Sequence, residues 1–180
     1  MKIVKAFNPD LTCRGYQFKE GLNVTEKANC RANGFHGAEN PLDCLSYYSD
    51  ISKSVFYLCE AKGDIDEDSV DSKVSCTHLI LEKKLSVFDF VAEALLYINA
   101  HPHRPLHHLI KADKGFASKH FVIVAGKNPV AAGELSTVLG YVVRRSNGKI
   151  NVYIRVVDGE DYLPGVYYDW FGDEVEQNDR

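Results

Sequence analysis

SVFDFVAEALLYINA, at residues 86–100, carries the most regular hydrophobic pattern of the chain. Its apolar residues recur every three or four positions, which is the spacing of one face of an α-helix. Ser86 can cap the first turn, and Pro102 follows the last one, where it stops the helix. We therefore expect one amphipathic helix in the middle of the chain, with regions of different character on either side.

A second, shorter helix is predicted upstream. Asn40 is a good N-cap, Pro41 suits the first helical position, and Asp43 places a negative charge in the first turn. These signals predict a helix from Pro41 to about Tyr48. The acidic segment 63–71 is typical of a loop. Apolar runs predict strands at residues 2–7, 55–61 and 74–81.

The region after residue 110 has the pattern of a β-rich structure. Its β-like runs are separated by glycines, and the pair Asn147-Gly148 is the strongest hairpin signal of the chain. The predicted fold class is α+β, with a mixed N-terminal sheet and two helices over residues 1–110, followed by a β-rich C-terminal part at residues 111–180. We expect any homo-oligomer to form through residues 111–180.

The composition is that of a globular protein with a small negative charge. Hydrophobic residues make up 45% of the chain, and the formal net charge is −4. General binding of nucleic acids needs a basic face, so we do not expect it. No apolar run approaches the roughly 20 residues that span a bilayer, and no signal peptide is recognisable. We expect no membrane partner and a cytoplasmic location. Five widely spaced cysteines without a C-x-x-C pair predict reduced thiols.

The segment CRGYQF, at residues 13–18, combines a cation, a glycine and two aromatic side chains. The guanidinium of Arg14 suits recognition of a carboxylate or a phosphate. Gly15 would let a ligand approach the backbone closely. Tyr16 is a candidate for stacking on a flat ring such as a nucleobase. The alternative is a surface arginine beside a β-turn.

The segment GFHGAENPLD, at residues 34–43, places a histidine just ahead of the predicted helix. A helix N-terminus gathers unsatisfied N–H groups, so Gly37 and Asn40 are predicted to help hold an anion. His36 could donate a hydrogen bond to a phosphate or a ribose, or act as an acid or base. The alternative is a histidine that is hydrogen-bonded within a turn. Tyr48 is a second candidate for stacking.

Two further features concern catalysis and metals. Glu60 ends an apolar strand and is the candidate catalytic carboxylate if the protein is an enzyme; an exposed carboxylate at the end of a strand is the alternative. The histidine-rich run HPHRPLHH, at residues 101–108, is broken by prolines and has no carboxylate or thiol at a useful spacing. It predicts a linker and no metal site.

The two motifs at residues 13–18 and 34–43 resemble those of an uncharacterised family whose members occur largely in phages and prophages. The resemblance covers roughly the first 110 residues. A weaker similarity runs to ADP-ribosyltransferase-like folds, in which an Arg-Gly strand, an aromatic segment leading into a helix and a downstream glutamate line the NAD cleft. Arg14-Gly15, residues 35–48 and Glu60 follow that order.

We carry three functional hypotheses forward. In the first, Arg14 and N–H groups of residues 37–42 hold a phosphate-bearing nucleotide of the NAD or ADP-ribose kind, with Tyr16 or Tyr48 on its base. Such a binder needs no cofactor, and in the cytosol of a phage-infected host it could sequester a defence signal. The second is an ADP-ribosyltransferase that uses NAD and Glu60. The third is a structural or assembly protein of a phage particle.

Overall fold

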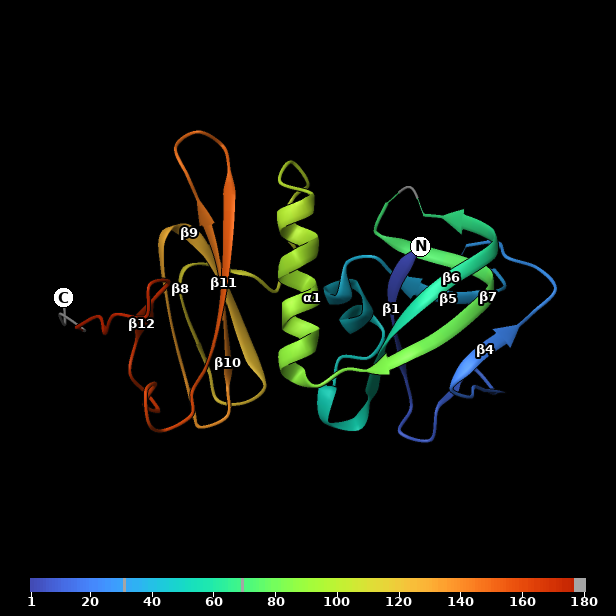
Figure 1. Cartoon of the computed structure of the whole chain (residues 1–180), viewed down its shortest axis with the longest axis horizontal. Coiled ribbons are helices and arrows are strands. Elements are labelled where there is room, and N and C mark those ends of the chain that lie inside the picture. The colour runs from blue at the N-terminus through green and yellow to red at the C-terminus, as the bar shows by residue number, and fades with distance from the viewer. Residues whose placement is uncertain (31, 69, 177–180) are drawn as a thin grey trace. The chain divides into compact units, whose positions relative to one another are not determined.

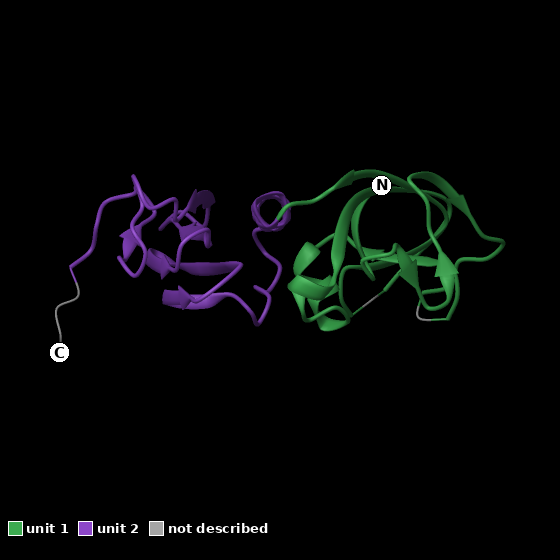
Figure 2. Cartoon of the chain, turned by 90° about the horizontal axis from the view of Figure 1, so that it is seen from below, with its two compact units in different colours: residues 1–86 green, residues 87–180 purple. Residues whose placement is uncertain are grey.

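The computed structural model of the chain describes residues 1–30, 32–68 and 70–176. The chain divides into two compact units, Met1–Ser86 and Val87–Arg180 (Figure 1 and Figure 2). The helix predicted at residues 86–100 belongs to the second unit. The domain division at residue 110 stays a prediction from the sequence pattern.

The first unit is built around an antiparallel sheet in which four strands form a closed ring. β5 and β6 each pair with both β1 and β7, and β4 pairs with β7 in addition (Figure 1). This arrangement brings the short strand β5 between two longer ones. The strands are β1 (Lys2–Phe7), β4 (Gly21–Val24), β5 (Phe35–Ala38), β6 (Val55–Glu67) and β7 (Lys73–Lys84).

The helix predicted from Pro41 to Tyr48 is wrong in type. The segment forms a six-residue 3₁₀ helix, η1 (Pro41–Ser46), and a second one follows as η2 (Ile51–Lys53). The capping signals are real, since the Asn40 side chain accepts from the N–H of Leu42 at 3.2 Å. So short a helix depends on its anchors, and here the Cys44 Sγ donates to the carbonyl of Val4 on β1 at 3.3 Å.

The acidic segment 63–71, which the sequence predicts as a loop, is strand over residues 63–67, and Ser69 lies outside the described residues. β6 continues to Glu67 and pairs with β7 as far as Val74, with register shifts that include one between Lys62 and Ile65. Its last six residues are exposed. Polar residues form a strand here because the backbone of β7 supplies the hydrogen bonds, whatever the side chains.

The core of the first unit lies on the inner face of this ring of strands. Alternate residues of β1, Ile3 and Phe7, point into it together with residues of β6 and β7. Lys5 lies between them in the same alternation and is itself buried. A lysine therefore occupies a core-facing position of the first strand.

The second unit packs one helix against a mixed sheet. The helix is α1 (Val87–Ala100), which contacts β9, β10 and β11 and confirms the helix predicted from the sequence (Figure 1). Gly140 on β10 lies under it, where an added Cβ would come 3.2 Å from Val91 Cγ1. β8, β9 and β10 run parallel, whereas β11 and β12 are antiparallel to their neighbours. The strands are β8 (Lys111–Ala117), β9 (Phe121–Gly133), β10 (Val138–Arg144), β11 (Ile150–Val156) and β12 (Tyr168–Asp169).

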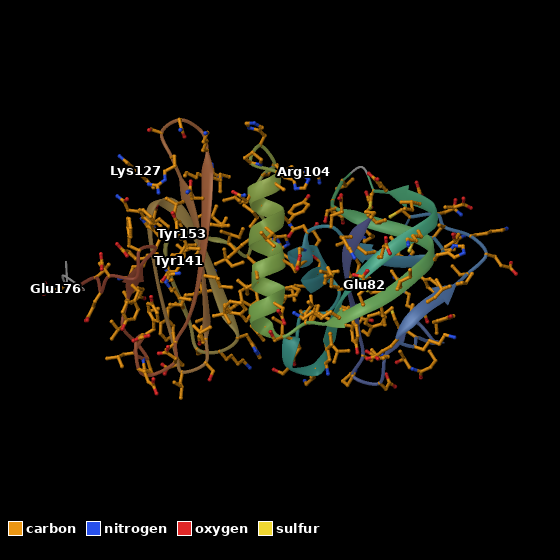
Figure 3. The ribbon with its side chains drawn as sticks, viewed as in Figure 1. Glu82, Arg104, Lys127, Tyr141, Tyr153 and Glu176 are labelled. Atoms are coloured by element: carbon orange, nitrogen blue, oxygen red, sulfur yellow. The ribbon has the colours of Figure 1, made fainter. Side chains whose placement is uncertain are left out.

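Tyr141 lies at the centre of the core of this second unit. It pairs with Tyr153 across β10 and β11 (Figure 3), and its hydroxyl donates to the carbonyl of Tyr168 at 3.1 Å. The side chain of Tyr141 is fully buried. A buried phenol with a satisfied hydroxyl fixes β12 against the sheet.

The fold class predicted from the sequence is therefore wrong. The chain is mostly β, with 47% strand and 13% helix in three sheets, and α1 is the single α-helix among the described residues. The physical reason is that the segment predicted as the second helix forms a 3₁₀ helix, and that the short strand β5 just before it pairs with β1 and β7. Within the described ranges, no helix has the length and apolar character needed to cross a bilayer.

Candidate functional site

A pocket of about 730 Å³ lies in the first unit, between β1, β5, β7, η1 and the hairpin of β2 (Thr12–Cys13) and β3 (Tyr16–Gln17). Five residues predicted to bind a ligand line it. Gly15, Asn40 and Glu60 do not. The two motifs predicted from the sequence thus line the same pocket. The predicted residues that line it are Arg14, Tyr16, His36, Gly37 and Tyr48.

Arg14 is presented by a tight turn. Cys13 pairs with Tyr16, so Arg14 and Gly15 form the two-residue loop of a β-hairpin. Both have positive φ, +47° and +80°, as a type I′ turn requires. Gly15 therefore serves the turn, and nothing lies within 4 Å of where its Cβ would be. Among described residues the guanidinium of Arg14 has no hydrogen-bond or ion-pair partner.

His36 lies on β5, opposite Ser75 of β7. Burial lowers the pKa of its imidazole below the ordinary value, and the positive charges of Lys5, Arg14 and Lys73 lower it further. A hydrogen bond with the backbone of Gly34 acts in the opposite direction. The ring is therefore neutral at pH 7 and lies in an electropositive environment.

Lys5 is a pocket residue that the sequence reading missed. It is only 5% exposed, and its Nζ donates to the carbonyl of His36 at 2.9 Å and to Cys13 Sγ at 3.6 Å. The ammonium also lies 5.0 Å from the ring centroid of Phe7 and 5.1 Å from that of Phe18. Within the described part of the chain, no carboxylate lies within 4 Å of it. A period-two reading of β1, with Ile3 and Phe7 on the same face, could have found it.

The pocket lining includes one further cation, Lys73, and one carboxylate, Asp43. Lys73 donates to the hydroxyl of Tyr47 and lies 3.6 Å from the carboxylate of Asp71. Asp43 lines the pocket, but its Oδ2 accepts from the N–H of Ser72 at 3.1 Å and from its Oγ at 2.5 Å. The pocket therefore has more positive than negative charge, although the whole chain is negative.

Aromatic rings form one wall. Tyr16, Phe18 and Phe35 pack edge to face, with centroids 4.6 Å, 4.9 Å and 5.0 Å apart. Tyr16 is 40% exposed, so part of its ring is open to a ligand. Tyr48 is half-buried; burial, and then the neighbouring thiol of Cys13, raise the pKa of its hydroxyl above the ordinary value.

Asn40 and Gly37 have structural roles. The carbonyl and side chain of Asn40 accept from the N–H groups of Asp43 and Leu42, so both N–H groups are used within η1. Gly37 lines the pocket and packs on β1, where an added Cβ would lie 2.6 Å from Ile3 Cδ1 and 2.8 Å from the carbonyl oxygen of Val4. The N–H groups of Leu42 and Asp43 at the start of η1 are therefore already hydrogen-bonded to Asn40.

Glu60 lies on β6 and does not contribute to the pocket. Its carboxylate forms an ion pair with Lys62 at 2.9 Å, and the hydrogen bond from Lys62 lowers its pKa. Glu60 lies within β6, which continues to Glu67, and its role as a catalytic carboxylate stays a prediction. Among described residues, no group of three or more His, Cys, Asp or Glu side chains is placed to hold a metal ion.

The described cysteines are free thiols of two kinds. Burial raises the pKa of Cys44 and Cys59 to about 12 and that of Cys76 to about 11, whereas Cys13 and Cys30 are only partly buried. At about pH 8 the three buried thiols are protonated and unreactive. We expect iodoacetamide to alkylate Cys13 and Cys30 of the native protein well before the other three, as measured by peptide mass spectrometry. Equal rates at all five sites would contradict this, with urea-unfolded protein as the control.

The first unit is thus a β-sheet domain with a cationic pocket of the size of a small-molecule site. Residues 1–93 match a family described as Domain of unknown function (DUF7666). The match covers 93 of 180 residues, and the chain belongs to this family. No curated protein and no solved structure matches the chain. Every residue that lines the pocket lies within the matched range.

Proposed function

We propose that the protein binds a small, phosphate-bearing nucleotide of the NAD or ADP-ribose class in the pocket of its first unit. The observation that carries the proposal is Lys5. Burial of an ammonium without a carboxylate partner costs several kcal/mol, and proteins seldom tolerate it without a compensating charge. Lys5 lines the pocket, so an anionic ligand is the counter-ion that would compensate it.

The hydrogen-bond donors of the pocket support a phosphate as this anion. Arg14 has five N–H donors in a planar fork, and none of them bonds to another described residue. Lys5 has three, of which two are used by His36 and Cys13. Arg14 lies in the turn between β2 and β3 and Lys5 lies on β1, but both line one pocket. Phosphate oxygens accept such charge-assisted bonds well.

The size and the apolar wall of the pocket support a nucleotide rather than a free phosphate ion. Pockets of roughly 300–1,000 Å³ hold drug-sized ligands, and this one encloses about 730 Å³. Tyr16 offers a partly exposed ring for stacking on a base. An inorganic ion would leave that wall in contact with water.

Binding without turnover is the form of this function that the pocket supports best. Among the described lining residues Asp43 is the one carboxylate, and its Oδ2 is occupied by Ser72. Glu60, the carboxylate that a transferase of the proposed kind would use, lies outside the pocket. A protein that retains a nucleotide unchanged sequesters it, and capture of a host signal by a phage protein is the setting that we propose.

Thermal unfolding in the presence of ADP-ribose tests the proposal. A ligand at about 100 times its Kd adds roughly 2.7 kcal/mol to the free energy of unfolding, so we expect a clear rise of Tm. Arg14→Ala should weaken binding by about 1.5–3 kcal/mol and remove most of that rise. Arg144→Ala is the matched control, since Arg144 is an exposed arginine of β10 outside the pocket. An unchanged Tm with ADP-ribose, NAD and cyclic nucleotides, or an equal rise in Arg14→Ala, would contradict the proposal.

A further inference from the structure

His36 is the one histidine among the residues that line the pocket. It lies on β5, half-buried, and bonds to the backbone of Gly34. Histidine changes its charge within the physiological pH range, so its surroundings decide whether the pocket gains a fourth positive charge. Those surroundings come from four neighbouring elements.

Three of these elements direct cations toward His36. β1 contributes Lys5, whose Nζ bonds to the carbonyl of His36 itself. The turn between β2 and β3 contributes Arg14, and β7 contributes Lys73. All three charges act on the imidazole and oppose its protonation.

The remaining titratable groups around the pocket include two carboxylates, of which Asp71 lies 3.6 Å from the ammonium of Lys73. On η1, Asp43 bonds to Ser72, and burial keeps the thiol of Cys44 protonated by raising its pKa to about 12. Tyr48 is also held neutral, since burial raises the pKa of its hydroxyl. The hydroxyl of Tyr47 accepts a hydrogen bond from Lys73, and the Sγ of Cys13 accepts one from Lys5.

We propose that His36 takes up a proton when the phosphate of the ligand enters the pocket, so that binding and protonation are coupled. The inference rests on the proposed function. A bound phosphate places negative charge beside the three cations that oppose protonation of His36, and this favours the imidazolium form. Because binding then consumes a proton, affinity must rise as the pH falls.

The size of the effect follows from linkage for a single proton. For each unit by which the pH falls, Kd should decrease by about three- to tenfold. This holds over the interval between the pKa of His36 in the free protein and its pKa in the bound protein. In the free protein, burial and the neighbouring cations hold the pKa of the His36 imidazole below its ordinary value. ADP-ribose is a suitable probe because its pyrophosphate group is esterified at both ends. It therefore has no ionisation near neutral pH.

Isothermal titration calorimetry with ADP-ribose tests the inference. The titration is carried out at about pH 6.5 in two buffers with different heats of protonation, and again at about pH 8. Wild type should take up protons on binding and bind more weakly at the higher pH. His36→Gln keeps a hydrogen-bonding side chain but cannot titrate. The variant should bind with no proton uptake, and its Kd should differ by less than about twofold between the two pH values.

The outcomes separate this inference from the function on which it rests. Wild-type binding without proton uptake, or uptake that persists in a folded His36→Gln variant, overturns the coupling and leaves the binding function standing. Absence of any binding to wild type contradicts the binding function itself. The wild-type measurement decides the coupling even if the variant fails to fold, which its thermal unfolding reveals.

Discussion

Lys5→Met is expected to weaken ADP-ribose binding strongly while the protein stays folded. Methionine keeps the length and the apolar contacts of the lysine stem with Phe7 and Phe18 but removes the ammonium. The affinity should fall by about ten- to hundredfold, because a buried charge-assisted bond contributes about 1.5–3 kcal/mol. Binding is measured by calorimetry.

The same variant should change the free energy of unfolding by no more than about 1 kcal/mol. It loses the hydrogen bond to the carbonyl of His36, but it no longer buries an unpaired charge, and the two effects oppose each other. The matched control is Lys53→Met, since Lys53 lies on η2 with 83% of its side chain exposed. Strong destabilisation by Lys5→Met, or unchanged binding, would show that the buried ammonium serves the fold and not a ligand.

Gly37→Ala should destabilise the first unit by about 2–3 kcal/mol. The added Cβ would meet the carbonyl oxygen of Val4 at 2.8 Å, which belongs to the backbone of a strand paired on both sides and cannot move aside. The contact with Ile3 Cδ1 at 2.6 Å lies in the same core. Urea unfolding followed by circular dichroism measures the effect.

Gly15→Ala is the control for this substitution. Gly15 has a positive φ of +80° but nothing within 4 Å of its Cβ position, so only backbone strain of about 1 kcal/mol is expected. If both variants lost the same stability, close packing of β5 on β1 would not be the reason for glycine at position 37. The two glycines were both predicted to serve a ligand, and this comparison distinguishes their structural reasons.

The elements that could be predicted from the sequence are those with a long, regular pattern. In α1 and β1 the apolar side chains follow a single pattern over most of the element, and both elements form as predicted. Residues 41–48 carry correct capping signals, but capping does not distinguish an α-helix from a short 3₁₀ helix held by packing. β5 was missed because its sequence, Phe-His-Gly-Ala, has a turn-like composition, and it is a strand only because β1 and β7 both pair with it.

The candidate site shows the same division between local and long-range information. Arg14 and His36 stand out by residue type and neighbours, and the structure places both on one pocket. Lys73 could not be inferred, because its place there depends on the pairing of β7 with β5. The compartment, the phage setting, any assembly through residues 111–180 and the role of a ligand stay predictions.

The central claim is that the pocket of the first unit holds a phosphate-bearing nucleotide. A titration of ¹⁵N-labelled protein with ADP-ribose, followed by amide chemical shifts, tests it most directly. Saturable shifts are expected in residues 13–18 and 34–38, with the amides of β8 to β11 unchanged. Shifts that do not saturate, or that centre on the second unit, would contradict it.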